Sequence, residues 1–304
     1  MRICKRLLAI LILLTLCLAS AASAKTFRPL PWTRERSLIR LKDENFLPDH
    51  GGYHDASMDI RVETVERFGT PVMLVRVKLA DASQFRTAVT GVYPSKRTAL
   101  VSTLAQRCNA VLAINGDNCI IHNDGIVYRN GVQLRLRPNA GRDTLIVDDE
   151  GNFTILAPTP QFLSMAEGEE WWKGFLRKNK LTPIHVFCFG PGLVIDGKKI
   201  ESTDVHIADI AKDTPLRRMA IGQTGPLEYL IIATQGPEDG DRLGLTIMQM
   251  AELCAEFGCI QAYNLDGGIS TAVVLRGERI NSPDNRVNRT VGDCIWFASL
   301  DNGR

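Results

Sequence analysis

The stretch Gly125-Ile126-Val127-Tyr128-Arg129-Asn130-Gly131-Val132-Gln133-Leu134 places an Asn-Gly pair between two short runs with an apolar pattern. Both central residues of a type I′ turn need positive φ, which Asn and Gly adopt at the lowest cost. The pair therefore predicts a two-residue β-hairpin and, with it, antiparallel strands. Asp149–Asn152 and Asp196-Gly197 predict two further turns of this kind.

On both sides of this hairpin, the apolar pattern predicts more strands than helices. Residues 58–79 alternate apolar and polar side chains around a turn at residues 68–71, which is typical of a long hairpin. Buried strands are also predicted for four short apolar runs: Val111–Ile114, Leu227–Thr234, Cys259–Asn264 and Cys294–Ala298.

Helices are predicted at three places. One begins near Ser95 and repeats apolar residues at helical spacing up to Cys108, and residues 160–180 indicate a helical insertion. The clearest helix is Thr246–Phe257, where Thr246 and Gln249 form a capping-box pair. We therefore predict an α+β fold: a mixed, largely antiparallel sheet core with flanking helices.

The first 24 residues are typical of a secretory signal peptide. Basic residues precede an apolar run from Leu7 to Leu18, and Ala22-Ser23-Ala24 resembles a cleavage site. We expect residues 25–57 to form an N-terminal arm and residues 58–304 to form one domain, exported to the periplasm, the cell envelope or the medium. Without the leader the formal net charge of +2 becomes about −1, since three basic residues are lost, and nothing favours nucleic acid as a partner. No later segment is long and apolar enough to span a membrane.

Six cysteines follow the leader, at positions 108, 119, 188, 254, 259 and 294. An even number in an exported chain allows three disulfides, but the sequence does not choose the pairing. Buried free thiols are an equal alternative in a domain of this size.

Two loops that follow predicted strands carry the residues best suited to chemistry. Asn264-Leu265-Asp266-Gly267-Gly268 presents an amide and a carboxylate beside two glycines, and Ser270 and Thr271 follow. Asn115-Gly116-Asp117 has the same character. Two such loops could supply the two carboxylates that glycosyl transfer to water uses, although each alone is also an ordinary turn.

Arginines near these loops suit a phosphate group, because a guanidinium binds two oxygens at once. Arg218 opens a predicted strand, and Arg289 precedes Asp293 near the end of the chain. Exposed arginines that only meet solvent are the alternative. The histidines form no set with metal-ligand spacing, and His122 alone is more typical of a structural residue.

The order of these pieces resembles the phosphodiester glycosidase family over roughly residues 85–300. The pieces are Asn115-Gly116-Asp117, Gly125–Gly131, Phe189–Gly197, Arg218–Gly222, Gly244-Leu245-Thr246, Asn264–Gly268 and Arg289–Asp293.

The resemblance implies a hydrolase that cleaves a sugar-1-phosphodiester at the anomeric bond and releases sugar and a phosphomonoester. It implies Asp266 and Asp117 as catalytic carboxylates. Substrate contacts are implied for nine further residues: Asn115, Arg218, Asn264, Gly267, Gly268, Ser270, Thr271, Arg289 and Asp293.

Two alternatives stay open: a phosphodiesterase that cleaves the P–O bond, and a non-catalytic module that binds envelope glycans, with Trp171 and Trp172 as stacking platforms. The sequence indicates no particular cofactor, although the carboxylates and amides could hold a divalent cation. The family usually has a third glycine where this chain has Ile269, and often a serine where it has Gly292.

Overall fold

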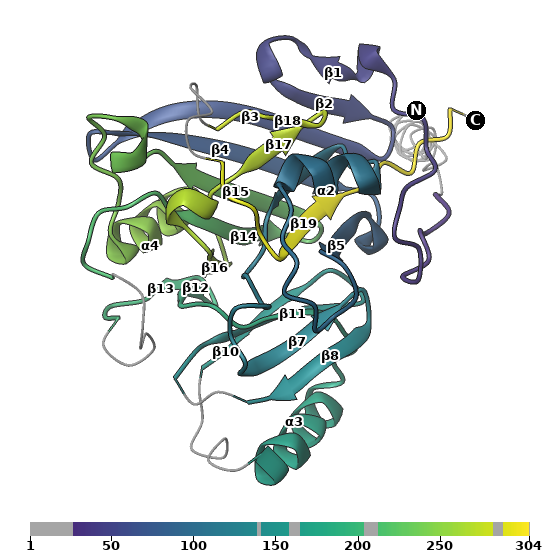
Figure 1. Ribbon diagram of the computed structural model, residues 1–304, viewed down its shortest axis with the longest axis vertical. Coiled ribbons are helices and arrows are strands. Elements are labelled where there is room, and N and C mark those ends of the chain that lie inside the picture. The colour runs from purple at the N-terminus through teal and green to yellow at the C-terminus, as the bar shows by residue number, and fades with distance from the viewer. Residues whose placement is uncertain (1–26, 139–140, 158–164, 204–211, 282–287, 304) are drawn as a thin grey trace, which may run out of the picture.

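The computed structural model describes residues 27–138, 141–157, 165–203, 212–281 and 288–303 (Figure 1). The predicted leader therefore lies outside the described residues. Within them, every strand pair is antiparallel. The strands form one sheet of nine and two of five.

The nine-stranded sheet contains the longest hairpin. β3 and β4 pair over their full length, from Met58 opposite Leu79 to Arg67 opposite Thr70. In spatial order the strands are β1 (Phe46–Leu47), β2 (Gly52–Asp55), β3 (Met58–Arg67), β4 (Thr70–Leu79), β15 (Glu228–Thr234), β14 (Met219–Gly225), β16 (Gln261–Leu265), β12 (Gly192–Ile195) and β13 (Lys198–Lys199).

One five-stranded sheet holds the Asn-Gly hairpin, whose turn residues Asn130 and Gly131 have φ of 51° and 79°. Its order is β10 (Phe153–Leu156), β9 (Thr144–Asp148), β11 (Pro183–Phe187), β7 (Gly125–Arg129) and β8 (Val132–Arg137). The other five-stranded sheet has the order β18 (Glu278–Arg279), β17 (Val273–Leu275), β6 (Leu112–Asn115), β19 (Asp293–Phe297) and β5 (Phe85–Val89).

Each described α-helix covers a different sheet. The apolar face of α4 (Ile247–Glu256) packs on the nine-stranded sheet, α2 (Val101–Cys108) on β6, β17 and β19, and α3 (Met165–Asn179) on β7, β9 and β11. Short 3₁₀ helices lie at Asp43–Asn45, Pro48–His50, Ala82–Gln84, Pro237–Asp239 and Gly268–Ser270.

One apolar core joins the three sheets. Its buried side chains come from strands of all of them, including Ile231 of β15, Phe187 of β11 and Ile295 of β19. The lower sheet in Figure 1 carries α3. The core therefore fixes the strand ends that carry the polar loops.

The antiparallel core and the flanking helices agree with the predicted fold, but strands dominate, so the fold is β-rich more than evenly mixed. The capping box of Thr246 and Gln249 is present, and Ile247, Met250, Ala251 and Cys254 are buried as predicted. The first helix starts later than predicted, at Val101.

Part of the segment predicted as an N-terminal arm belongs to a sheet. Phe46–Asp55 adds β1 and β2 to the large sheet, which the sequence pattern did not indicate.

The six cysteines after the leader are all buried and free. Among the described residues, no helix has both the length and the apolar character needed to cross a bilayer.

Candidate active site

The two predicted loops meet where β6 and β16 end. Asn115, the last residue of β6, donates its amide to the Asp266 backbone oxygen at 2.7 Å and accepts from the Ala272 N–H at 3.0 Å. Gly268 donates its N–H to the Arg217 oxygen at 2.8 Å. The segments at 115–118, 217–218 and 264–271 therefore lie together.

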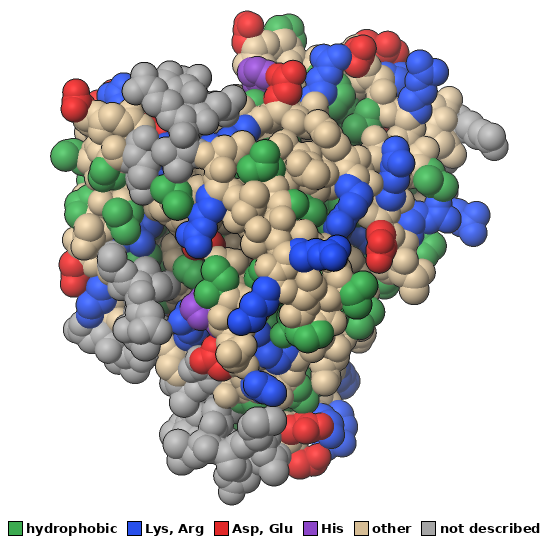
Figure 2. Space-filling view, viewed as in Figure 1, with side chains coloured by type: hydrophobic (Ala, Val, Ile, Leu, Met, Phe, Trp, Pro, Cys, Tyr) green, Lys and Arg blue, Asp and Glu red, His purple; other side chains and the backbone are tan. Residues whose placement is uncertain are grey.

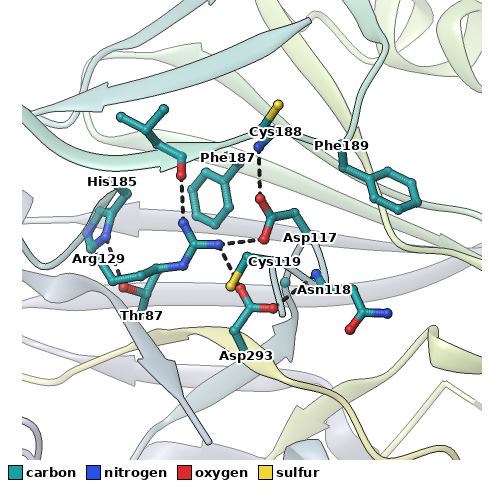
Figure 3. A network of polar contacts seen from close by, with 12 residues as sticks. Thr87, Asp117, Asn118, Cys119, Arg129, His185, Phe187, Cys188, Phe189 and Asp293 are labelled. Carbon is teal, nitrogen blue, oxygen red and sulfur yellow. Dashed lines mark hydrogen bonds and ion pairs between the residues drawn. The ribbon is translucent and has the colours of Figure 1, made fainter. Parts of the chain in front are cut away.

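A buried group of charges lies directly behind the 115–118 loop, and we call Asp117, Arg129 and Asp293 the charged cluster (Figure 3). The Arg129 Nη2 contacts Asp117 Oδ1 at 2.5 Å and Asp293 Oδ2 at 2.9 Å. Its Nη1 donates to the Val186 oxygen at 2.6 Å. The cluster therefore joins the loop after β6 to β7, β11 and β19.

The remaining carboxylate oxygens of the cluster accept from backbone. Asp117 Oδ2 accepts from the Cys188 N–H at 2.8 Å, and Asp293 Oδ1 accepts from the Asn118 N–H at 3.0 Å. Asp117 and Asp293 are 1% and 0% exposed. These two carboxylates are thus enclosed and fully engaged with protein groups.

Burial sets the protonation of the cluster. Burial lowers the pKa of Arg129, but the adjacent carboxylates outweigh it, so the guanidinium pKa is raised and the group stays charged. Burial and the negative charge of Asp117 raise the pKa of Asp293 to about 7, against the opposing effect of Arg129. One cation therefore faces two carboxyl groups, of which Asp293 holds a proton at mildly acidic pH.

Two glycines allow this close packing. A Cβ on Gly116 would lie 2.1 Å from Asp293 Oδ2, so any side chain there would displace the carboxylate. A Cβ on Gly292 would lie 2.3 Å from Ile120 Cγ1. Ile120 therefore fills the space that a serine at position 292 would need.

In front of the cluster lies a set of polar groups that we call the polar rim: Asn118, Asp266, Ser270 and Thr271. Asn118 has φ of 56° and donates its amide to Asp266 Oδ2 at 3.2 Å. In Figure 3 its side chain points away from the Arg129 guanidinium. Unlike Asp117 and Asp293, Asp266 is partly exposed.

The polar rim contains buried oxygens that make no hydrogen bond to other described residues. They are Asn118 Oδ1 and Thr271 Oγ1, and Asn264 Oδ1 behind the rim also has no partner among the described residues. Buried polar atoms are seldom left without a partner, because each costs free energy. Three such atoms lie in the two adjoining loops.

Charges of both signs act on Asp266, since Arg289 lowers the pKa of its carboxyl and Asp117 raises it. Burial raises the pKa of the Asp266 carboxyl, while the Ser270 hydroxyl and the Arg289 guanidinium lower it. Arg289 is exposed. In Figure 2, Lys and Arg side chains lie across the middle of the face shown, whereas most Asp and Glu side chains lie toward its edge.

Two residues that were not predicted as site residues flank the cluster. Arg142 is buried over the Phe189 ring, with its guanidinium carbon 5.9 Å from the ring centroid. Half-buried His122 has its ring 6.3 Å from that of Phe189. Burial and Arg142 lower the pKa of His122, so its imidazole is neutral near pH 7.

Several predicted substrate contacts support the loops instead. Arg218 is buried and donates to the backbone oxygens of Leu245 and Thr214 at 2.9 and 2.8 Å, so the phosphate contact expected there gives way to a structural role. Asn115 and Asp293 are likewise committed to backbone and cluster. Of the expected contacts, Ser270, Thr271 and Arg289 keep groups suited to a ligand.

A metal could be considered at Asp117, Cys119 and Asp293, whose ligand atoms lie within 4.8 Å of one another. Arg129 already supplies positive charge to both carboxylates at this point. Burial raises the pKa of the Cys119 thiol well above its usual value, so the residue is a protonated thiol. The donor set therefore fits a cation poorly.

Comparisons with known proteins identify the family of this chain. Residues 108–298 match the phosphodiester glycosidase family, and the chain belongs to that family. A Bacillus subtilis relative, the SPbeta prophage-derived uncharacterized protein YomE, is 33% identical over 115 residues, which are 38% of this chain and 17% of that protein.

Two solved structures share the fold. The zebrafish N-acetylglucosamine-1-phosphodiester alpha-N-acetylglucosaminidase catalytic domain, auto-inhibited by its pro-peptide, superposes with a TM-score of 0.59 at 15% identity, covering 80% of this chain and 83% of that one. A hypothetical protein from Synechocystis gives 0.57 at 14% identity, covering 79% and 62%.

Proposed function

We propose that this protein hydrolyses sugar-1-phosphodiesters at the anomeric C–O bond. The observation that carries the proposal is the polar rim: one partly exposed carboxylate, Asp266, beside buried hydroxyl and amide oxygens that lack partners among the described residues. Membership of the phosphodiester glycosidase family supports the class of bond. The zebrafish enzyme that shares the fold is named for a substrate of the same kind, an N-acetylglucosamine-1-phosphodiester.

In this proposal Asp266 acts on water. A phosphomonoester is a good leaving group, so the reaction depends little on a general acid and more on a base and on stabilised positive charge at the sugar. Burial raises the pKa of Asp266, and a carboxylate with a raised pKa is a stronger base. Water attacks the anomeric carbon, its proton passes to Asp266, and the C–O bond breaks as the phosphomonoester leaves.

The other groups bind the substrate. Ser270, Thr271 and Asn118 offer oxygens to sugar hydroxyls, and exposed Arg289 suits a phosphate oxygen pair near Asp266. The charged cluster holds the loop that carries Asn118, so Asp117 supports catalysis without touching the sugar.

We place the reaction outside the cytoplasm, on envelope or extracellular glycans. The support for this is the leader-like pattern of the first 24 residues.

The test is hydrolysis of a panel of methyl esters of sugar 1-phosphates in oxygen-18 water. We expect free sugar carrying the label at its anomeric hydroxyl and unlabelled methyl phosphate. Label in the phosphate would replace this proposal by P–O cleavage. No turnover by wild type of any panel member, with clear binding by calorimetry, would identify a glycan-binding module.

A further inference from the structure

Two cysteines meet where α4 ends and β16 begins. Cys254 lies in the last turn of α4, and Cys259 follows Gly258, whose φ is 84°. The Cys259 N–H donates to the Cys254 oxygen at 2.9 Å, and the Gly258 N–H donates to the Ala255 oxygen at 3.1 Å. These bonds form a Schellman-type helix end, which commonly brings the side chains at the positions of Cys254 and Cys259 into contact.

Packing keeps the two thiols in this place. Cys254 and Cys259 are 1% and 5% exposed and belong to the same apolar cluster. A Cβ on Gly222 of β14 would lie 2.5 Å from the Cys259 sulfur, so that thiol rests against bare backbone. The Cys259 thiol is the largest cause, ahead of burial, that raises the pKa of Cys254. The geometry of the helix end and the shared apolar cluster therefore place the two thiols next to each other.

The other buried cysteines lack this local constraint. Cys108 and Cys294 also share an apolar cluster, but they lie on separate elements, α2 and β19. Cys119 and Cys188 lie beside the charged cluster, where Asp117 contributes to raising the pKa of each thiol.

We propose that Cys254 and Cys259 are a modification site: a small-molecule disulfide oxidises them to a disulfide bond that fastens the end of α4 to the start of β16. The Cys259 thiolate attacks one sulfur of the oxidant and releases one thiol. The Cys254 thiolate then attacks the mixed disulfide and releases the second. The oxidant is reduced by two electrons and receives the two protons.

The disulfide between Cys254 and Cys259 would stabilise the folded protein. β16 leads directly from Cys259 to Asn264 and Asp266, so the link reduces the freedom of the unfolded chain next to the site without touching the polar rim. This inference is independent of the proposed function.

The test exposes the folded protein to oxidised glutathione at mildly alkaline pH, where thiolates are more abundant. Free thiols are then alkylated in denaturant, and the chain is digested without reduction by a protease that cleaves after glutamate. Glu256 lies between the two cysteines, so peptides containing Cys254 and Cys259 stay joined only through the disulfide. We expect this joined species, with two hydrogens lost, and a rise in Tm of several degrees that reduction reverses.

Matched variants complete the experiment. Cys254→Ser and Cys259→Ser should each abolish both the joined peptides and the rise in Tm, whereas Cys108→Ser should keep both. If Cys254 and Cys259 are both recovered alkylated from oxidised wild type, or are linked to other cysteines, the proposal is overturned. Joined peptides without a rise in Tm would overturn the stabilising role.

Discussion

The charged cluster and the polar rim both place carboxylates at strand ends, yet their surroundings differ. In the cluster, Asp117 and Asp293 are enclosed, and each pairs with Arg129 and with backbone N–H groups. In the rim, Asp266 is partly exposed and lies beside oxygens without partners among the described residues. An aspartate therefore supports the fold in the charged cluster, whereas in the polar rim it stays accessible to a ligand.

The largest expected effect comes from removing the cation of the cluster. Arg129→Met leaves two carboxyl groups buried without a counter-charge, and we expect a loss of about 3 to 5 kcal/mol in the free energy of unfolding at pH 7. Urea denaturation measures it. The control is Arg276→Met, which removes a side chain that is 52% exposed and should cost about 1 kcal/mol or less. Equal losses in the two variants would contradict the structural role of the cluster.

A substitution in the polar rim should lower activity and leave stability unchanged. Asp266→Asn keeps the shape of the side chain but removes its charge and basicity, so turnover of the best glycosyl phosphodiester should fall roughly a hundredfold. The melting temperature should stay near that of wild type. Asp149→Asn changes an exposed carboxylate and should leave both unchanged. Full activity in Asp266→Asn would show that this residue only shapes the turn and takes no part in the reaction.

The pH dependence of stability sharpens the comparison. The pKa of Asp293 is raised to about 7 in the folded protein, against about 3.9 for an unperturbed Asp. Its stabilising contribution is therefore fully present below the unfolded pKa and is lost as pH rises through about 7. Denaturation at several pH values should show wild type losing stability relative to Asp293→Asn between about pH 4 and 7. Parallel curves would show that Asp293 does not hold the proton.

The smallest effect is expected at the edge of the rim. Ile269 is 38% exposed beside Asp266, so Ile269→Gly should change the free energy of unfolding by about 0.5 kcal/mol or little more. Removing this bulk should raise kcat/KM for bulky glycosyl phosphodiesters more than for small ones. Steady-state kinetics on such a pair measures it, and an unchanged ratio would remove Ile269 from the substrate-contacting surface.

Sequence patterns predicted the parts of the fold that depend on local chemistry. The Asn130-Gly131 turn and the helix cap at Thr246 were predicted correctly, because few residue types adopt the positive φ of such a turn or form the hydrogen bonds of such a cap. β5 and β11 were missed, since polar and charged residues such as Arg86 and His185 interrupt their apolar pattern. Those side chains are buried through long-range contacts that no local pattern reveals.

The site was predicted in outline for the same reason. Glycines and carboxylates after apolar strands indicated the loops that meet at Asn115 and Asp266. Arg129 lay inside the Asn-Gly hairpin but was not predicted as a site residue, because its partners Asp117 and Asp293 come from other elements of the fold. An arginine at an inward position of an otherwise apolar strand was the available signal.

Arg86 has a practical consequence for handling this protein. Its guanidinium is buried, lies 5.0 Å from the Trp32 ring centroid and 5.8 Å from that of Trp296, and donates to the backbone oxygens of Leu30, Pro31, Trp32 and Arg34. A shortened gene that starts after Arg34 would leave this cation without its acceptors. Expression tags and protease cleavage sites should therefore be placed before Leu30, where they leave the hydrogen bonds of Arg86 intact.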